Sequence, residues 1–249
     1  MTMSTSRYRR LDARHIAATI ASLKRRIDFR FPGSGLGHVC GELLEMGEAA
    51  DAYVDSLRKP IYSIRAISWL CIGTIILLGL APFAVLLNAE VWVDAPGALG
   101  GLGGMMEAIE ATLSELVLLG VAVLFLATAE GRTKRSRSLR SLRELRSIAH
   151  VVDMHQLSKD PKDLLSGSGM EAVDAAASGL DEMSTEDLAH YLDYCSEVLS
   201  LTSKLAALSL EGFHDHVVLA AVNEIENLAS GLSRKIWQKI MILDRVAEE

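Results

Sequence analysis

The chain has few of the residues on which several protein classes depend. Only three of its 249 residues are cysteine, and Cys40, Cys71 and Cys195 are widely spaced, so they form neither a disulfide framework nor a zinc motif. Aromatic residues make up 5% of the chain and five residues are proline, a composition that favours helices over sheets. The net charge of -7 argues against nucleic acid as a partner.

Enzyme signatures are also missing. The sequence contains no Gly-x-Ser-x-Gly, no phosphate-binding Gly-Lys-Ser/Thr loop, no Cys-x-x-Cys and no His-Glu-x-x-His. The glycine-rich stretch 31–37 follows a predicted helix rather than a strand, so we interpret it as a turn between helices. We therefore expect a non-catalytic protein that needs no cofactor.

Two long apolar runs, Ala66–Ala89 and Leu116–Ala129, contain no charged residue. No Lys or Arg lies between them, whereas the stretch Arg132–Arg146 directly after them has seven basic residues. This pattern predicts a helical hairpin that crosses a membrane twice, and the positive-inside rule then places both termini in the cytoplasm. The second run is too short to cross alone, so we expect its helix to begin near Ala108.

The predicted fold class is all-α, with a two-span transmembrane hairpin and a cytoplasmic helical bundle built from both ends of the chain. We expect cytoplasmic helices in residues 1–60 and 132–249, with the hairpin in residues 61–131. Its spans cover about 66–89 and 108–129, and a Gly-rich exterior loop covers 90–107. The expected location is a bacterial inner membrane.

Apolar residues recur at helical spacing in the parts outside the hairpin. We expect a first helix through Arg26, a second that ends before Pro60, and one long helix from about Ala108 to Gln156, interrupted at most weakly at Gly131. A further helix begins after Ser184, and Gly212 separates it from the last. We expect Leu36, Leu43, Ala50 and Leu57 to be buried against other helices. The residues that keep helical spacing are Ile16, Ile20, Leu23 and Ile27; Leu36, Cys40, Leu43, Gly47, Ala50, Val54 and Leu57; Leu142, Leu145, Ala149 and Val152; Leu188, Leu192, Cys195, Leu199, Thr202, Leu205 and Leu208; and Val218, Val222, Ile225, Leu232, Ile236, Ile240 and Leu243.

Glu115 is the main candidate for a functional residue inside the membrane, and Glu110 is a second one. Glu115 lies about 22 Å along the helix from Glu130, which places it in the outer part of the hydrocarbon. Charges at that depth are unfavourable and usually functional. A protonated Glu115 has a possible partner in the Leu78 carbonyl, which Pro82 leaves without its helical hydrogen bond. Alternatively, Glu115 extends to the outer interface and has no function.

Two further groups of residues are candidates for binding lipid head groups or a metal ion. The basic run, with Arg132, Lys134, Arg135 and Arg137 nearest the membrane, is suited to contacts with anionic lipid head groups as well as to setting the topology. A weaker hypothesis is a metal site built from His150, Asp153, His214 and His216, should these residues meet in the bundle; scattered histidines are more often solvated, so we expect no metal.

The sequence therefore predicts a non-catalytic module that is anchored in a lipid bilayer. Its apolar helix faces would mediate homo-oligomerisation or dock a protein partner. The alternative is an oligomeric subunit that conducts ions or protons, with Glu115 near the pore. A hairpin of two helices encloses no pore alone, so this alternative requires oligomerisation.

Overall fold

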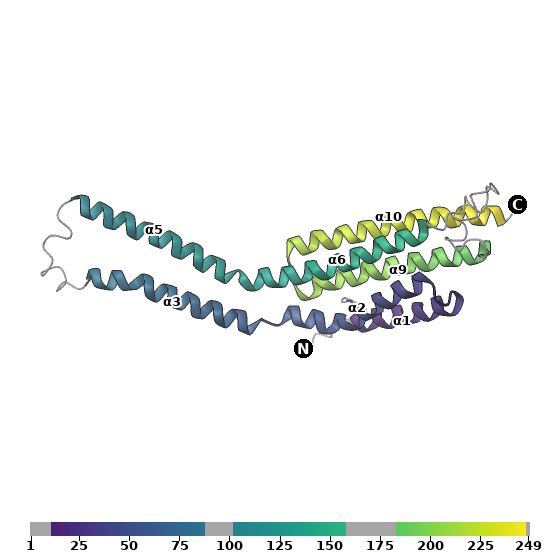
Figure 1. The fold of residues 1–249 in the computed structure, drawn as a ribbon, viewed down its shortest axis with the longest axis horizontal. Helices are drawn as coiled ribbons and strands as arrows, with labels where there is room; N and C mark the ends of the chain where they lie inside the picture. Colours follow the sequence, from purple (N-terminus) through teal and green to yellow (C-terminus); the bar gives the residue numbers. More distant parts are fainter. Residues whose placement is uncertain (1–10, 88–101, 158–182, 248–249) are drawn as a thin grey trace, which may run out of the picture. The chain divides into compact units, whose positions relative to one another are not determined.

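The computed structural model describes residues 11–87, 102–157 and 183–247, and every regular element within these ranges is an α-helix (Figure 1). The chain divides into two compact units. Residues 1–58 and 135–249 form one unit, here called the bundle, and residues 59–134 form the other, here called the helix pair. The predicted all-α class and the helical bundle are confirmed.

The bundle begins with two antiparallel helices, α1 (Ala13–Arg30) and α2 (Gly35–Arg58). The side chain of Asp12 caps α1 by accepting a hydrogen bond from the Arg14 backbone N–H, at 3.0 Å. Gly33 turns the chain between the helices with a φ of 72°, in the left-handed region that favours glycine. The predicted helices and the break between them are confirmed.

Helix α9 (Thr185–Gly212) packs against α1, α2 and α10 (His216–Ala247). Helix α9 begins directly after Ser184, as the sequence predicts, and Ser184 caps it by accepting a hydrogen bond from the Asp187 N–H, at 3.1 Å. Helix α9 ends at Gly212, also as predicted, and the chain then turns into α10.

The last helix of the bundle is α6 (Ala129–Leu157), of which the part from Arg135 to Leu157 belongs to the bundle. It runs parallel to α10, because Arg135 pairs with Asp215 near the start of both helices and Lys239 donates to the Gln156 carbonyl near their ends. The predicted burial of Leu36, Leu43, Ala50 and Leu57 is confirmed, and the other positions at helical spacing in α1, α2, α6, α9 and α10 are also buried. Most of these side chains belong to one apolar core.

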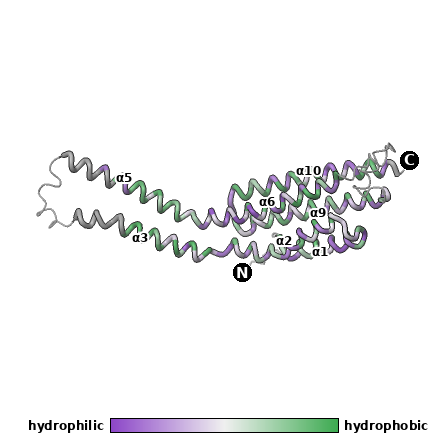
Figure 2. Tube along the Cα trace, viewed as in Figure 1, coloured by the Kyte–Doolittle hydropathy of each residue, from purple (hydrophilic) through white to green (hydrophobic). Residues whose placement is uncertain are grey.

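The helix pair consists of α3 (Tyr62–Leu87) and α5 (Leu102–Ala127), which pack against each other. The hydropathy colouring shows their described parts as largely apolar (Figure 2). Ser68 and Ile72 of α3 are buried, but most large apolar side chains described in the pair are exposed. These are Tyr62, Ile67, Trp69, Leu70, Ile76, Leu77, Leu113, Leu116, Val117, Leu118, Val121, Leu124 and Phe125.

By length and composition, the described residues contain one helical run that is apolar enough to cross a membrane, Gly35–Leu77, and its most apolar window is only 11% buried. A second qualifies if Leu113–Ala127 and Ala129–Leu157 count as one span, bent by 42°. An apolar helix in a soluble core would be mostly buried, and this window is not.

Two predicted boundaries need correction. Helix α5 begins at Leu102, not near Ala108, so part of the predicted loop 90–107 is helical. The rest of that loop and the predicted connection around Asp160 and Pro161 lie outside the described residues.

The second correction concerns the long helix, which is interrupted at Thr128 rather than Gly131. The Thr128 hydroxyl lies 3.0 Å from the Leu124 carbonyl and 3.1 Å from the Phe125 carbonyl, while Arg132 also donates to the Phe125 carbonyl. Such side-chain bonds to carbonyls one turn back bend helices.

Candidate functional site

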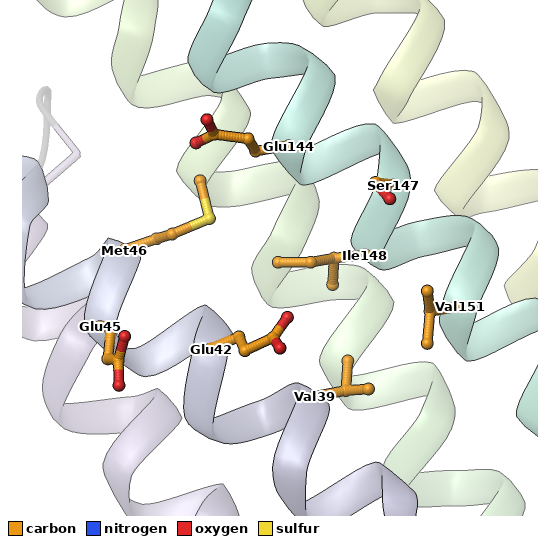
Figure 3. A pocket seen from close by; sticks show the side chains of 8 residues that line it. All are labelled: Val39, Glu42, Glu45, Met46, Glu144, Ser147, Ile148 and Val151. Atoms are coloured by element: carbon orange, nitrogen blue, oxygen red, sulfur yellow. The ribbon is translucent and has the colours of Figure 1, made fainter.

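A groove of about 320 Å³ lies between α2 and α6 in the bundle (Figure 3). Its wall on α2 carries Val39, Glu42 and Met46, at positions i, i+3 and i+7 of one helix face. The wall on α6 repeats this spacing with Glu144, Ser147 or Ile148, and Val151. Glu45 completes the lining.

The groove exists because α2 and α6 approach each other at two points on either side of it. At one end, an added Cβ on Gly35 would collide with the His155 ring, so glycine allows the end of α6 to pack there. At the other end, the Tyr53 hydroxyl lies beside Ser138 and Ser141, although Tyr53 and Ser138 make no hydrogen bond of good geometry. Burial raises the pKa of Tyr53.

The base of the groove is apolar and its rim is acidic. Val39 and Ile148 are 7% and 6% exposed and form the base, while Val151 is 39% exposed. In Figure 3, the side chains of Met46 and Glu144 extend toward each other from opposite walls. The eight lining residues include three exposed carboxylates, of Glu42, Glu45 and Glu144, and no Lys, Arg or His. This arrangement suits a docked helix better than catalysis.

A second set of polar contacts joins the start of α3 to the start of α6. The Glu130 carboxylate accepts a hydrogen bond from the Ile61 backbone N–H, at 3.2 Å, and pairs with Lys134 at 3.0 Å. The hydrogen bond from Lys134 lowers the pKa of Glu130, and the Ile61 N–H adds to that shift. Lys134 is only 9% exposed. Glu130 therefore ties the start of α3 to the start of α6.

The predicted functional residues Glu110 and Glu115 are both exposed on α5. Glu115 lies among exposed apolar side chains, with Leu113 at 62% and Leu116 at 65% exposure. In the part of the chain with described contacts, it makes no ion pair. In a bilayer, it would have to meet lipid, another copy or the interface.

The four basic residues predicted to contact lipid head groups differ in their surroundings. Lys134 pairs with Glu130, and Arg135 pairs with Asp215 at 2.7 Å. The Arg132 guanidinium lies 3.6 Å from the centre of the Phe125 ring. Arg137 is exposed. Lipid contact stays a prediction, and Arg132 and Arg137 are the exposed members of the four.

The metal candidates are dispersed. His150, His214 and His216 are exposed, and the Asp153 carboxylate accepts a hydrogen bond from Gln156 at 2.5 Å. Among the residues that the structure describes, no three His, Cys, Asp or Glu side chains gather closely enough to hold a metal ion.

Sequence reasoning missed the groove entirely. Periodicity identifies the buried face of each helix, but it does not say which helices are neighbours. The available signal was the Glu residues that flank the buried faces, Glu42 and Glu45 beside Leu43 and Glu144 beside Leu145. Such residues usually form a solvated edge.

Comparisons with protein families, with curated proteins and with solved structures found no match.

Proposed function

We propose that this protein is a non-catalytic docking module anchored in the membrane by a hairpin of two transmembrane helices, α3 and α5. The bundle is its cytoplasmic part, and the groove between α2 and α6 is its binding surface. The observation that carries this proposal is the contrast in burial: the bundle encloses an apolar core, whereas the helix pair exposes most of its large apolar side chains.

Helix length supports two spans. Helices α3 and α5 have 26 residues each, or about 39 Å at roughly 1.5 Å per residue, which exceeds the hydrocarbon thickness of roughly 30 Å. The early start of α5 makes the helix long enough to cross, and Glu110 and Glu115 then lie within its length. Arg58, Lys59 and Arg65 before α3, together with the basic run after α5, favour cytoplasmic termini.

Membrane extraction tests the anchor. We expect the protein to stay in the membrane pellet after washing with alkaline carbonate or 4 M urea and to dissolve only in detergent. As a matched control, a chain that lacks residues 59–134, with a short Gly/Ser linker in their place, should be soluble. Release of the full chain by carbonate would contradict the anchor.

Glu115 supports a second candidate function, an oligomeric ion- or proton-conducting subunit. Its carboxyl is exposed on an otherwise apolar face of α5. In an oligomer, several copies could direct this group into a wet interior. The charge-removal experiment in the Discussion distinguishes the two functions.

A further inference from the structure

We propose that the groove between α2 and α6 binds a cationic amphipathic helix from a partner protein. This inference rests on the docking function proposed above and specifies the chemistry of the partner. It uses three properties of the groove: its apolar base, its length and its charge.

The apolar base matches the side chains of one helix face. From Val39 to Met46 the groove follows two turns of α2, about 10 Å at roughly 1.5 Å per residue. Over that length, one face of an incoming helix presents three side chains to the groove, at positions i, i+4 and i+7. A volume of about 320 Å³ holds two or three such side chains rather than a whole helix. Met46 can adjust to their shapes because its side chain is flexible and polarisable.

The charge of the rim selects the partner. Glu42, Glu45 and Glu144 contribute three carboxylates, and no lining residue is basic. Lys or Arg on the edges of the incoming helix would pair with these carboxylates, which orients the helix and speeds its association. The same carboxylates repel anionic lipid and nucleic acid.

Charge also argues against a second copy as the occupant. If two copies met groove to groove, the three carboxylates of one rim would face and repel the same carboxylates of the other. The strongly basic stretch of this chain, Arg132–Arg146, is partly used internally, because Arg135 pairs with Asp215 and Arg146 pairs with Glu224. A separate cationic helix is the occupant that best complements the groove.

The test uses the full chain in nanodiscs of zwitterionic lipid. The probe is a phage-displayed library of helical 20-residue peptides, with empty nanodiscs used to remove peptides that bind lipid. Recovered peptides are then synthesised with a fluorescent label and titrated by anisotropy. We expect them to carry apolar residues at i, i+4 and i+7, flanked by at least three Lys or Arg.

Variants of two rim carboxylates test whether the peptides bind in the groove. The double variant Glu42→Lys/Glu144→Lys should weaken binding at least tenfold, and Glu42→Gln/Glu144→Gln should weaken it about threefold to tenfold with less effect on the fold. Glu48→Lys, an exposed residue of α2 outside the groove, is the matched control and should change affinity less than twofold. Circular dichroism should show equal helix content in all variants.

Several outcomes would overturn the proposal. These are recovery of no peptide above the empty nanodiscs, recovery of acidic or uncharged peptides, and equal affinity for wild type and both double variants. Self-association that the double variant abolishes would assign the groove to a second copy and would also overturn it. If peptides fail to bind while the chain resists carbonate extraction, the partner chemistry is wrong and the anchor stands.

Discussion

Arg135 places its guanidinium 2.7 Å from the Asp215 carboxylate, at the point where the chain re-enters the bundle and α10 begins. Arg58, where the chain leaves the bundle, donates to the backbone carbonyl of Glu211 at 3.1 Å. The two connections to the helix pair are therefore both held by the turn between α9 and α10.

Removing the charge of Asp215 should destabilise the bundle. Its side chain is only 8% exposed, and it also accepts hydrogen bonds from the N–H groups of Val217 and Val218 at the start of α10. Asp215→Asn keeps a good helix cap but leaves Arg135 without its counter-charge. We expect a loss of about 1–3 kcal/mol in the free energy of unfolding at pH 7, measured by denaturant titration in detergent.

The effect of Asp215→Asn should depend on pH. Burial disfavours ionisation of Asp215, but Arg135 and the two N–H groups outweigh it and lower the pKa of the carboxyl. Its stabilisation is therefore complete above the unfolded pKa of about 3.9 and is lost as pH falls below that value through the folded pKa. The difference between wild type and variant should shrink below pH 4. Glu224→Gln, at an exposed ion pair, should cost less than about 0.5 kcal/mol at any pH.

Two glycine substitutions should have opposite effects. A Cβ on Gly212 would lie 2.9 Å from both the Leu57 Cβ and the Val54 carbonyl oxygen, so Gly212→Ala should push α9 away from α2 and cost about 1–3 kcal/mol. Gly231 has open space around it within α10, and Gly231→Ala should stabilise the bundle by about 0.5–1 kcal/mol. Thermal unfolding measures both, and equal melting temperatures for the two variants would refute the close packing at Gly212.

Leu43→Asp should disrupt the bundle. Leu43 is fully buried on α2, so the substitution places an unpaired charge in the core and should cost about 3–5 kcal/mol. Ala49→Asp introduces the same group at an exposed position of the same helix and should cost less than about 1 kcal/mol. Limited proteolysis should cleave the first variant faster. If both variants resisted the protease as well as wild type does, the face of α2 that carries Leu43 would not be packed.

The core of the bundle could be predicted from the sequence because burial itself imposes the helical period. Ile20, Leu43 and Leu199 are all completely buried, as their spacing indicates. The pairing of Arg135 with Asp215 and the opposition of Met46 to Glu144 could not be predicted, because they join residues about 80 and 100 positions apart. They depend on the order in which the helices pack, which periodicity does not encode.

Charge removal at Glu115 separates the anchor from the channel. In the anchor, Glu115→Gln should be nearly silent, because an amide can also donate to the Leu78 carbonyl or extend to the interface. Glu115→Leu should be slightly stabilising if the carboxyl only extends to the interface, since it removes a polar group from lipid. In a channel, Glu115→Gln should alter conductance or its pH dependence. We expect proteoliposomes of wild type and Glu115→Gln to show no ion flux, whereas flux that the variant changes would favour the channel.

Cysteine labelling tests whether the chain crosses the membrane twice with the bundle in the cytoplasm. Cys40 and Cys195 are buried, and burial raises the pKa of the Cys40 thiol to about 11, so neither should react readily with a maleimide. Once Cys71 is replaced with Ser, labelling therefore reports the introduced cysteine. In intact cells, a membrane-impermeant maleimide should label Gly100→Cys. It should label Ser4→Cys and Glu249→Cys only after the membrane is opened. Labelling of all three from one side, or of Gly100→Cys only from the cytoplasmic side, would contradict the account.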